Sequence, residues 1–323
     1  MEDLELGNFR NFYEAVLGEV QKQVVGQEEV VREVLTAILA GGSVLMEGAP
    51  GLGKTVLVKT FARVLDLPFS RIQFTPDLMP VDITGTYIVN KTESGLAFDF
   101  QEGPIFSSLI LADEINRATP KTQSAMLEAM QEKTVTVGKK TYPLPRPFFV
   151  LATQNPLEME GTYRLPEAQL DRFLFKLKIG LPREEDIYRI LDLTVSGREG
   201  REAEKRASRE EILAAQRHAA QVPVAANVKK KAVALMLETH PDRTSVPAVR
   251  EYVACGASPR GVQSVILGAK VRALSEGRFN VAFEDIASMA RPALRHRIFL
   301  NFKAQAEKVD PDMILEEVLK KVK

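Results

Sequence analysis

A glycine-rich segment between an apolar run and a helical stretch constrains the fold of this chain most. Gly48-Ala-Pro-Gly-Leu-Gly-Lys54-Thr55 has the spacing of a phosphate-binding loop. Glycines let successive backbone N–H groups curl around phosphate oxygens without Cβ clashes, and the following helix adds its positive N-terminal end. Lys54 would reach the β and γ phosphates, and the Thr55 hydroxyl would ligate Mg²⁺. The expected nucleotide contacts are Gly48, Ala49, Pro50, Gly51, Leu52, Gly53, Lys54, Thr55 and Val56.

Short apolar runs alternate with helical stretches up to about residue 180, which predicts a parallel sheet covered by helices. The runs are largely apolar rather than alternating, as expected for strands that are buried on both faces. The five expected strands lie at residues 43–47, 69–74, 108–112, 148–153 and 174–179. A helix should begin at Thr119-Pro120 and reach Glu132. Two hairpins, at residues 86–100 and 134–144, interrupt the alternation.

Beyond about residue 182 the strand signal stops and helical patterns continue. We therefore predict two domains, an α/β nucleotide-binding domain over residues 1–182 and a smaller all-α domain over residues 183–323. Residues 196–209 are polar and contain two glycines, which indicates an exposed loop. The expected helix starts are the capping box of Ser208 and Glu211, Asn227, Ser258-Pro259 and Asp310-Pro311.

Composition excludes several classes of protein. The 323 residues carry 43 Lys and Arg and 43 Asp and Glu, a formal net charge of +0, which argues against a chain that mainly coats nucleic-acid backbones. The single cysteine, Cys255, excludes an intramolecular disulfide, and we expect it in a packed segment. The three histidines lie far apart, which disfavours a metal site built on them. Because no apolar stretch reaches the ~20 residues that span a bilayer, and the first residues are acidic, we expect a cytoplasmic protein without a membrane span.

Two strand ends complete the candidate site. Residues 108–112 are followed by Asp113, which would hold magnesium directly or through water, and by Glu114, which would polarise the attacking water. The next strand leads to Asn155, which would orient that water or is an ordinary turn asparagine before proline. A dinucleotide-binding fold is disfavoured because no Gly-x-Gly-x-x-Gly opens the first helix. A GTPase is disfavoured because Asn90-Lys-Thr-Glu lacks the aspartate of a guanine-reading motif.

In this order, the loop, the Asp-Glu strand, the asparagine and the helical tail resemble the AAA+ ATPases, and more narrowly the MoxR family. The resemblance runs from about residue 25 to about residue 295. Val25-Gly26-Gln27 is similar to the segment that cups adenine, which adds Gly26 and Gln27 to the expected nucleotide contacts. The family motifs are Glu47-Gly-Ala-Pro-Gly-Leu-Gly-Lys-Thr55, Asp113-Glu-Ile-Asn-Arg-Ala118, Ala152-Thr-Gln-Asn-Pro156, Leu165-Pro-Glu-Ala-Gln-Leu-Asp-Arg-Phe173 and Gly256-Ala-Ser-Pro-Arg-Gly261.

The resemblance also implies roles for two arginines and for both hairpins. Arg172 corresponds to the arginine finger, which enters the nucleotide site of the neighbouring subunit. Arg260 corresponds to the second sensor arginine of the helical lid, and Ser258-Pro259 independently places it in the first turn of a helix. A guanidinium there would supply charged donors to a phosphate. Residues 83–101 resemble the insertion in the second helix, and residues 134–144 resemble the hairpin before the sensor strand. Both would face the pore of a ring or a substrate.

The fold implied is a P-loop NTPase of the AAA+ type, a five-stranded parallel sheet with helices on both faces, a helix-2 hairpin insertion and an all-α lid. The activity implied is Mg²⁺-dependent ATP hydrolysis at the subunit interfaces of a ring, expected to be a hexamer. It would drive chaperone-like remodelling, maturation or activation of protein complexes, sometimes beside a von Willebrand factor A domain protein.

Two alternatives stay open at this point. The first is a nucleic-acid motor or loader of a related clade, which the balanced charge disfavours. The second is a binding-only switch in which ATP orders a scaffold, and the joint presence of Glu114, Asn155 and Arg172 disfavours it.

Overall fold

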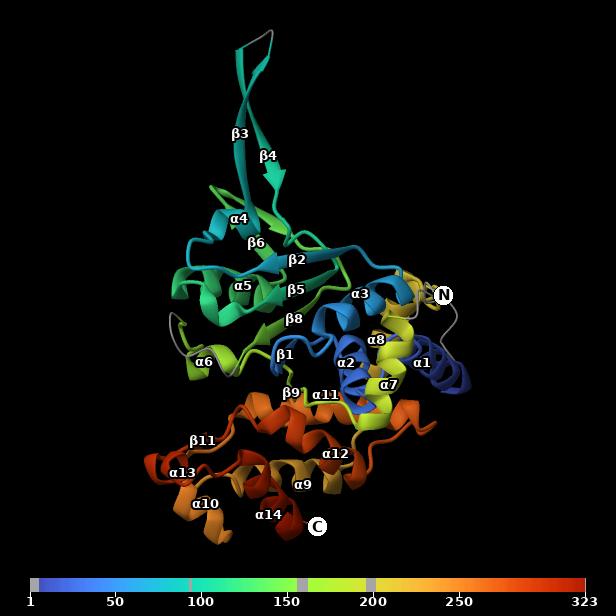
Figure 1. Ribbon diagram of the computed structural model, residues 1–323. Helices are drawn as coiled ribbons and strands as arrows, with labels where there is room; N and C mark the ends of the chain where they lie inside the picture. The colour runs from blue at the N-terminus through green and yellow to red at the C-terminus, as the bar shows by residue number, and fades with distance from the viewer. Residues whose placement is uncertain (1–5, 93–94, 156–161, 196–201, 323) are drawn as a thin grey trace.

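The computed structural model describes residues 6–92, 95–155, 162–195 and 202–322. At its centre lies a five-stranded parallel sheet in the order β2-β5-β8-β1-β9 (Figure 1). Its strands are β1 (Val44–Glu47), β2 (Phe69–Gln73), β5 (Leu109–Asp113), β8 (Phe149–Gln154) and β9 (Phe175–Lys178). All five expected strands are confirmed. In a parallel sheet every strand ends at the same edge, so β1, β5 and β8 bring the ends that carry the motifs together.

Both faces of the sheet are covered, because successive side chains along a strand point to opposite faces. Val44 and Met46 of β1 share a hydrophobic cluster with residues of helices α1 (Leu6–Gln21), α2 (Glu28–Leu39) and α3 (Lys54–Val64). Leu45 lies in a second cluster with residues of α5 (Pro120–Glu132) and Ile83 of α4 (Pro80–Thr84). Burial on both faces explains why the central strands β1, β5 and β8 are largely apolar, whereas the edge strands β2 and β9 are partly exposed and carry polar residues.

The chain after β9 is mainly helical. Its elements are α7 (Glu184–Thr194), α8 (Arg209–Gln221), α9 (Ala226–Leu237), α10 (Pro247–Tyr252), β10 (Val253–Cys255), α11 (Pro259–Ser275), α12 (Phe283–Leu294), β11 (Phe299–Leu300), α13 (Phe302–Ala306) and α14 (Pro311–Val322). Helix α11 packs so closely against β9 that a Cβ on Gly268 would lie 2.6 Å from the Phe175 ring. This contact docks the helices on the β9 side of the sheet (Figure 1). The division at residue 182 stays a prediction.

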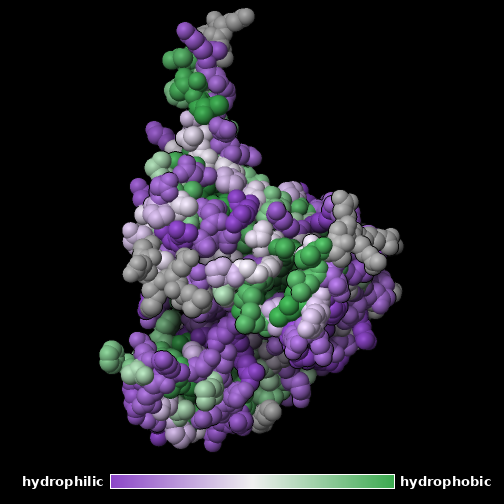
Figure 2. Space-filling view, in the orientation of Figure 1, coloured by the Kyte–Doolittle hydropathy of each residue, from purple (hydrophilic) through white to green (hydrophobic). Residues whose placement is uncertain are grey.

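Both expected hairpins are present, and aromatic side chains join them. Strands β3 (Gly85–Thr92) and β4 (Gly95–Glu102) form a long hairpin that projects from the body (Figure 1), and β6 (Thr134–Val137) pairs with β7 (Lys140–Pro143). The Tyr87 and Tyr142 hydroxyls lie 2.8 Å apart, and the Phe100 and Tyr142 rings stack with centroids 4.3 Å apart. Further out, β3 and β4 expose the apolar side chains of Val89, Leu96 and Phe98, which give the hairpin its green surface in Figure 2.

The predicted helix starts are mostly confirmed. At α8, the Glu211 N–H donates to Ser208 Oγ (3.3 Å) and the Ser208 N–H to Glu211 Oε2 (2.8 Å), which is the expected capping box. The prediction at Asn227 is wrong, because α9 begins at Ala226 and Asn227 lies inside its first turn. Alanine is the best helix former, so the helix begins one residue earlier, at Ala226, with Ala225 in extended conformation before it and without a side-chain cap.

One further expectation is confirmed in part and one is corrected. Residues 202–208 form a loop with four exposed side chains, those of Glu202, Glu204, Lys205 and Arg206. Ala203 and Ala207 are buried, however, and the N–H groups of Arg206 and Ala207 donate to the Val64 carbonyl (2.8 and 3.1 Å). The first part of that expected loop, residues 196–201, lies outside the described residues. Cys255 is exposed on β10 and not packed. Within the described ranges, no helix has the length and apolarity needed to cross a bilayer.

Candidate functional site

The phosphate-binding loop connects β1 to α3. Gly51 and Gly53 have φ of +82° and +79°, a backbone conformation that residues other than glycine adopt with strain. Gly48 is also required, because a Cβ there would lie 2.8 Å from the Ile179 carbonyl oxygen. The Lys54 ammonium donates to the Gly48 carbonyl at 2.6 Å, and burial lowers its pKa, although neighbouring carboxylates oppose that shift. A phosphate would give this partly desolvated ammonium an anionic partner.

Asp113 ends β5, and Glu114 follows it in an unusual backbone conformation. Glu114 has φ +55°, in the left-handed region that a non-glycine residue rarely occupies. The Thr153 hydroxyl of β8 donates to Asp113 Oδ1 at 2.6 Å and accepts from the Glu114 N–H at 2.8 Å. Thr153 is completely buried, so one hydroxyl fixes the direction of both acidic residues.

Strand β2 supplies partners for both carboxylates. Arg71 donates to Asp113 Oδ2 through Nε (3.1 Å) and a terminal nitrogen (2.7 Å), and that nitrogen also donates to Gln73 Oε1 (2.7 Å). Gln73 Nε2 donates to Glu114 Oε2 at 2.9 Å, and Arg117 donates to the same oxygen at 3.0 Å. Sequence analysis missed Arg71, Gln73 and Thr153. For Arg71 and Gln73 the signal was two polar residues with period-2 spacing in a strand run that is otherwise mostly apolar.

A cavity of about 410 Å³ collects most of the expected site residues. It contains groups from the loop, from the acidic pair and from the end of β8, and Arg71 closes one side. Asn155 is buried at its wall, only 5% exposed, next to the two acids. Its lining residues are Pro50, Gly51, Gly53, Lys54, Thr55, Val56, Arg71, Asp113, Glu114 and Asn155. The Thr55 hydroxyl and the Asp113 carboxylate are the hard oxygen donors that Mg²⁺ prefers, so the donor set fits that ion.

The expected adenine segment lies beside the start of α7. Gln27 Nε2 donates to the Gly180 carbonyl at 3.0 Å. Gly26 has φ +76°, and a Cβ there would lie 2.9 Å from Asp186 Cβ. The contact of Gly48 with Ile179 brings the loop to the same turn, so Gly26 and Gln27 lie on the loop side of the sheet. Ala49 and Leu52 are half-buried, and Leu52 packs against the main hydrophobic cluster.

Arg172 and Arg260 lie elsewhere. Arg172 is exposed and precedes β9 by three residues, at the amino edge of the sheet, whereas the loop follows β1 at the carboxyl edge. Arg260, in the first turn of α11, forms an ion pair of 3.9 Å with Asp171, the residue before Arg172. The buried Arg297 (2% exposed) donates through Nε to Asp171 Oδ1 at 2.8 Å and holds this corner in place. The structure therefore places Arg260 against the residue that precedes Arg172, away from the loop of their own chain.

A phosphate loop after β1, an acidic pair at the end of β5, a polar residue after the intervening β8 and a mainly helical lid define a class, the AAA+ ATPases. Family comparison agrees, since residues 43–175 match the ATPase family associated with various cellular activities (AAA) and residues 247–318 match the AAA lid domain. The sequence is 42% identical to Chaperone MoxR1 of Mycobacterium tuberculosis over 314 residues, covering 96% of this chain and 81% of the relative. The chain belongs to the MoxR family and is an ATP-hydrolysing enzyme.

Other relatives support the same placement. Protein MoxR of Methylorubrum extorquens is 31% identical over 315 residues, covering 92% of this chain and 90% of that protein. A solved structure from Cytophaga hutchinsonii superposes with a TM-score of 0.91 at 42% identity, covering 98% of this chain and 96% of that one.

Proposed function

We propose that this protein hydrolyses ATP with Mg²⁺ at interfaces between copies of itself in a ring, a hexamer by family resemblance. The observation that carries the proposal is the placement of the groups on two edges. Loop, acids and Asn155 lie at the carboxyl edge of the sheet, and Arg172 and Arg260 lie at the amino edge. A single copy therefore holds an incomplete site, and a second copy in head-to-tail contact completes it.

The residues of the cavity divide the work. The loop N–H groups and Lys54 bind the β and γ phosphates, and Thr55 and Asp113 would hold the magnesium ion. The ion, when bound, neutralises charge that develops on the phosphate oxygens. Glu114 accepts a proton from the attacking water, and Asn155 orients that water. Thr153 fixes the Asp113 carboxylate and the backbone of Glu114, so the segment that carries both acids is positioned before the reaction begins.

The amino edge of the next copy supplies the remaining positive charge. Arg172 and Arg260 would enter the neighbour's cavity together, since Asp171 lies between them in one corner. Their guanidinium groups would stabilise the charge that spreads over the γ phosphate during transfer. Loss of that phosphate would release both arginines and shift the neighbour as a rigid body.

We infer that this motion remodels protein clients in the cytoplasm, because a relative that covers nearly all of the chain is named a chaperone. The long β3–β4 hairpin, with exposed Val89, Leu96 and Phe98, is the part that would contact a client. A von Willebrand factor A domain protein is the partner that family resemblance suggests.

The test compares three variants by nucleotide binding and by turnover. Lys54→Ala should abolish ATP binding, because the ammonium that meets the β and γ phosphates is lost. Glu114→Gln should bind ATP and lose at least about 100-fold in turnover, the size expected for removing a general base. Lys59→Ala is the matched control, since Lys59 is exposed further along the same helix and should behave as the native chain. Normal turnover by Glu114→Gln would exclude Glu114 as the base.

A further inference from the structure

Arg71 and Gln73 on the edge strand β2 connect the two acidic residues of the site through one chain of hydrogen bonds. A terminal nitrogen of Arg71 lies 2.7 Å from Asp113 Oδ2 and 2.7 Å from Gln73 Oε1. Gln73 then donates to Glu114 Oε2 at 2.9 Å. The expected metal ligand and the expected base are therefore joined through two side chains of one strand.

The contact between Arg71 and Asp113 occupies the part of the carboxylate that a metal ion would use. Thr153 already donates to Oδ1 at 2.6 Å, and Arg71 approaches Oδ2 with two nitrogens, at 3.1 and 2.7 Å. A carboxylate in a two-nitrogen contact with a guanidinium has its charge balanced and its lone pairs engaged. Arg71 is 47% exposed, so it can leave without disturbing the core, whereas Thr153 is completely buried.

The same arginine determines how the Gln73 amide is turned. Because Arg71 donates to Gln73 Oε1, the amide nitrogen must face Glu114. Once Arg71 leaves, the amide loses the contact that holds it in this direction, and its hold on Glu114 weakens. Occupation of Asp113 and restraint of Glu114 are thus two effects of one side chain.

We propose that Arg71 is a positioning residue that competes with magnesium for Asp113, and that its departure, when the magnesium nucleotide binds, frees Gln73. This loosens one of the two contacts on Glu114 Oε2, the other being that of Arg117. Before the metal binds, Arg71 and Gln73 therefore keep the base restrained. This inference rests on the proposed function, because it requires Asp113 to be a metal ligand.

The test is a magnesium titration of the full chain with a fluorescent ATP analogue, the mant derivative, read as binding and not as turnover. In Arg71→Met the MgCl₂ concentration at half-saturation should fall about fivefold, since the loss of a charge-assisted contact at a half-exposed site has that order of effect. Arg71→Lys keeps the charge and one donor, so its half-saturation should lie between those of Arg71→Met and the native chain. Arg117→Met is the matched control. It removes an equal charge that contacts Glu114 and not Asp113, and should stay within about twofold of native.

The outcomes separate the two proposals. If the native chain fails to bind the mant nucleotide, the proposed function itself is wrong. If it binds, and Arg71→Met has an unchanged or higher half-saturation, Arg71 does not compete for Asp113 and the inference is overturned. An equal fall in Arg117→Met and Arg71→Met would also overturn it, because general charge would then explain the effect. If Arg71→Met does not fold, the half-exposed Arg71→Lys variant decides the question in the same titration.

Discussion

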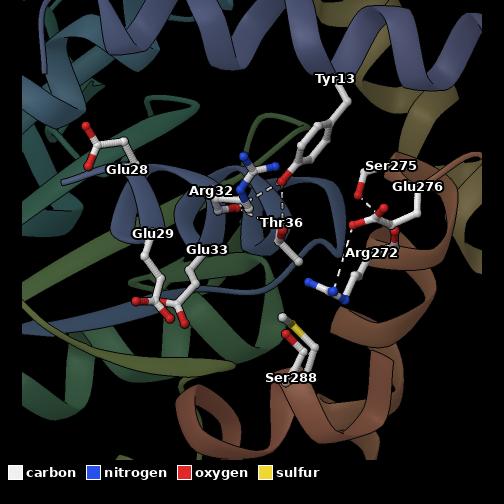
Figure 3. Close-up of a pocket in the computed structure, with 11 residues that line it drawn as sticks. Tyr13, Glu28, Glu29, Arg32, Glu33, Thr36, Arg272, Ser275, Glu276 and Ser288 are labelled. Carbon is white, nitrogen blue, oxygen red and sulfur yellow. Dashed lines mark hydrogen bonds and ion pairs between the residues drawn. The ribbon is translucent and has the colours of Figure 1, made fainter. Parts of the chain in front are cut away.

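Among the carboxyl groups of the described residues, that of Glu33 on α2 has the pKa furthest from its usual value. It lies in a cavity of about 270 Å³ between α1, α2, α11 and α12, where Figure 3 shows its carboxylate beside that of Glu29. Burial, together with the nearby charges of Glu29 and Asp312, raises the pKa of Glu33 to about 8, although Arg295 opposes the shift. The folded protein therefore keeps this carboxyl protonated over a range in which the unfolded chain ionises it.

This shift predicts how stability depends on pH. Between the unfolded pKa, near 4.5, and the folded pKa, about 8, the folded state binds more protons, so stability falls as pH rises through that window. Glu33→Gln stays neutral and should not lose this stability. The melting temperatures of variant and native chain should agree near pH 4.5 and diverge as pH rises to about 8. At pH 8 the difference in unfolding free energy should be on the order of 2 kcal/mol, a reduced value because the cavity is open to solvent.

A matched control makes the pH measurement specific. Glu28→Gln changes an exposed carboxylate in the first turn of the same helix, and its melting curve should run parallel to the native one. A constant difference between Glu33→Gln and the native chain across pH 5–9 would contradict the buried neutral carboxyl.

Residues that belong to a recognisable motif could be predicted from the sequence. Residues whose contacts depend on how two strands pair in the sheet could not. Lys54, Asp113 and Asn155 follow from motif spacing, and the cavity contains all three. Arg71 acts because parallel pairing places Gln73 opposite Asp113, so that an arginine two residues earlier can reach the acid. Register across a sheet is set by the packing of whole strands, and a single sequence does not contain it.

Helix α7 is the least buried element of comparable length. None of its eleven residues is buried, and Tyr188, Leu191 and Val195, next to its end, are 61%, 48% and 74% exposed. Figure 2 shows hydrophobic surface gathered over this region. Helices of this length are marginal in water without tertiary packing, so α7 is expected to be covered in the working state. Its first turn contacts Gly26, so the exposed face continues from the nucleotide site.

We therefore expect α7 to lie against the neighbouring copy. Leu191→Asp places a charge in the exposed apolar face and should weaken self-association by at least about tenfold, measured by sedimentation velocity with ATP present. Glu185→Ala, an exposed residue on the same helix, is the control and should assemble as the native chain. Assembly of Leu191→Asp at native concentrations would mean that another surface makes the contact.

Strands were predicted well where both of their faces are buried, and hairpins were predicted well where a turn residue marks the reversal of the chain. The five sheet strands and both hairpins follow from such patterns. The loop at residues 202–208 was predicted, but its attachment to the end of α3 was not. Backbone N–H groups make that attachment to the Val64 carbonyl, and such a contact leaves no side-chain signature.

Considered as a whole, the molecule carries its phosphate loop and Arg172 at opposite ends of two neighbouring strands, β1 and β9, and Arg260 lies beside Asp171. Mixing Arg172→Ala with Lys54→Ala should restore part of the ATPase rate, because some interfaces then pair an intact loop with an intact arginine edge. Arg260→Ala mixed with Lys54→Ala should do the same. The ATPase rate of each mixture is compared with the rates of its two variants measured separately. No gain in rate on mixing would contradict a site shared between copies.

A third mixture sharpens the test. Arg172→Ala mixed with Arg260→Ala should restore nothing, since both defects lie on one edge and each interface receives one defective edge. Recovery in that mixture would mean that the two arginines serve different sites, and would separate their roles.

Because the phosphate loop and the arginines lie on opposite edges of the sheet, the number of complete sites in an assembly depends on whether the assembly is closed. In the proposed ring, an open arc of copies would end in one loop without arginines and one pair of arginines without a loop, so it would have one working site fewer than it has chains. Only closure would give every chain a complete catalytic centre, and a partner that opened or capped the arc would change the output of the assembly without touching any nucleotide.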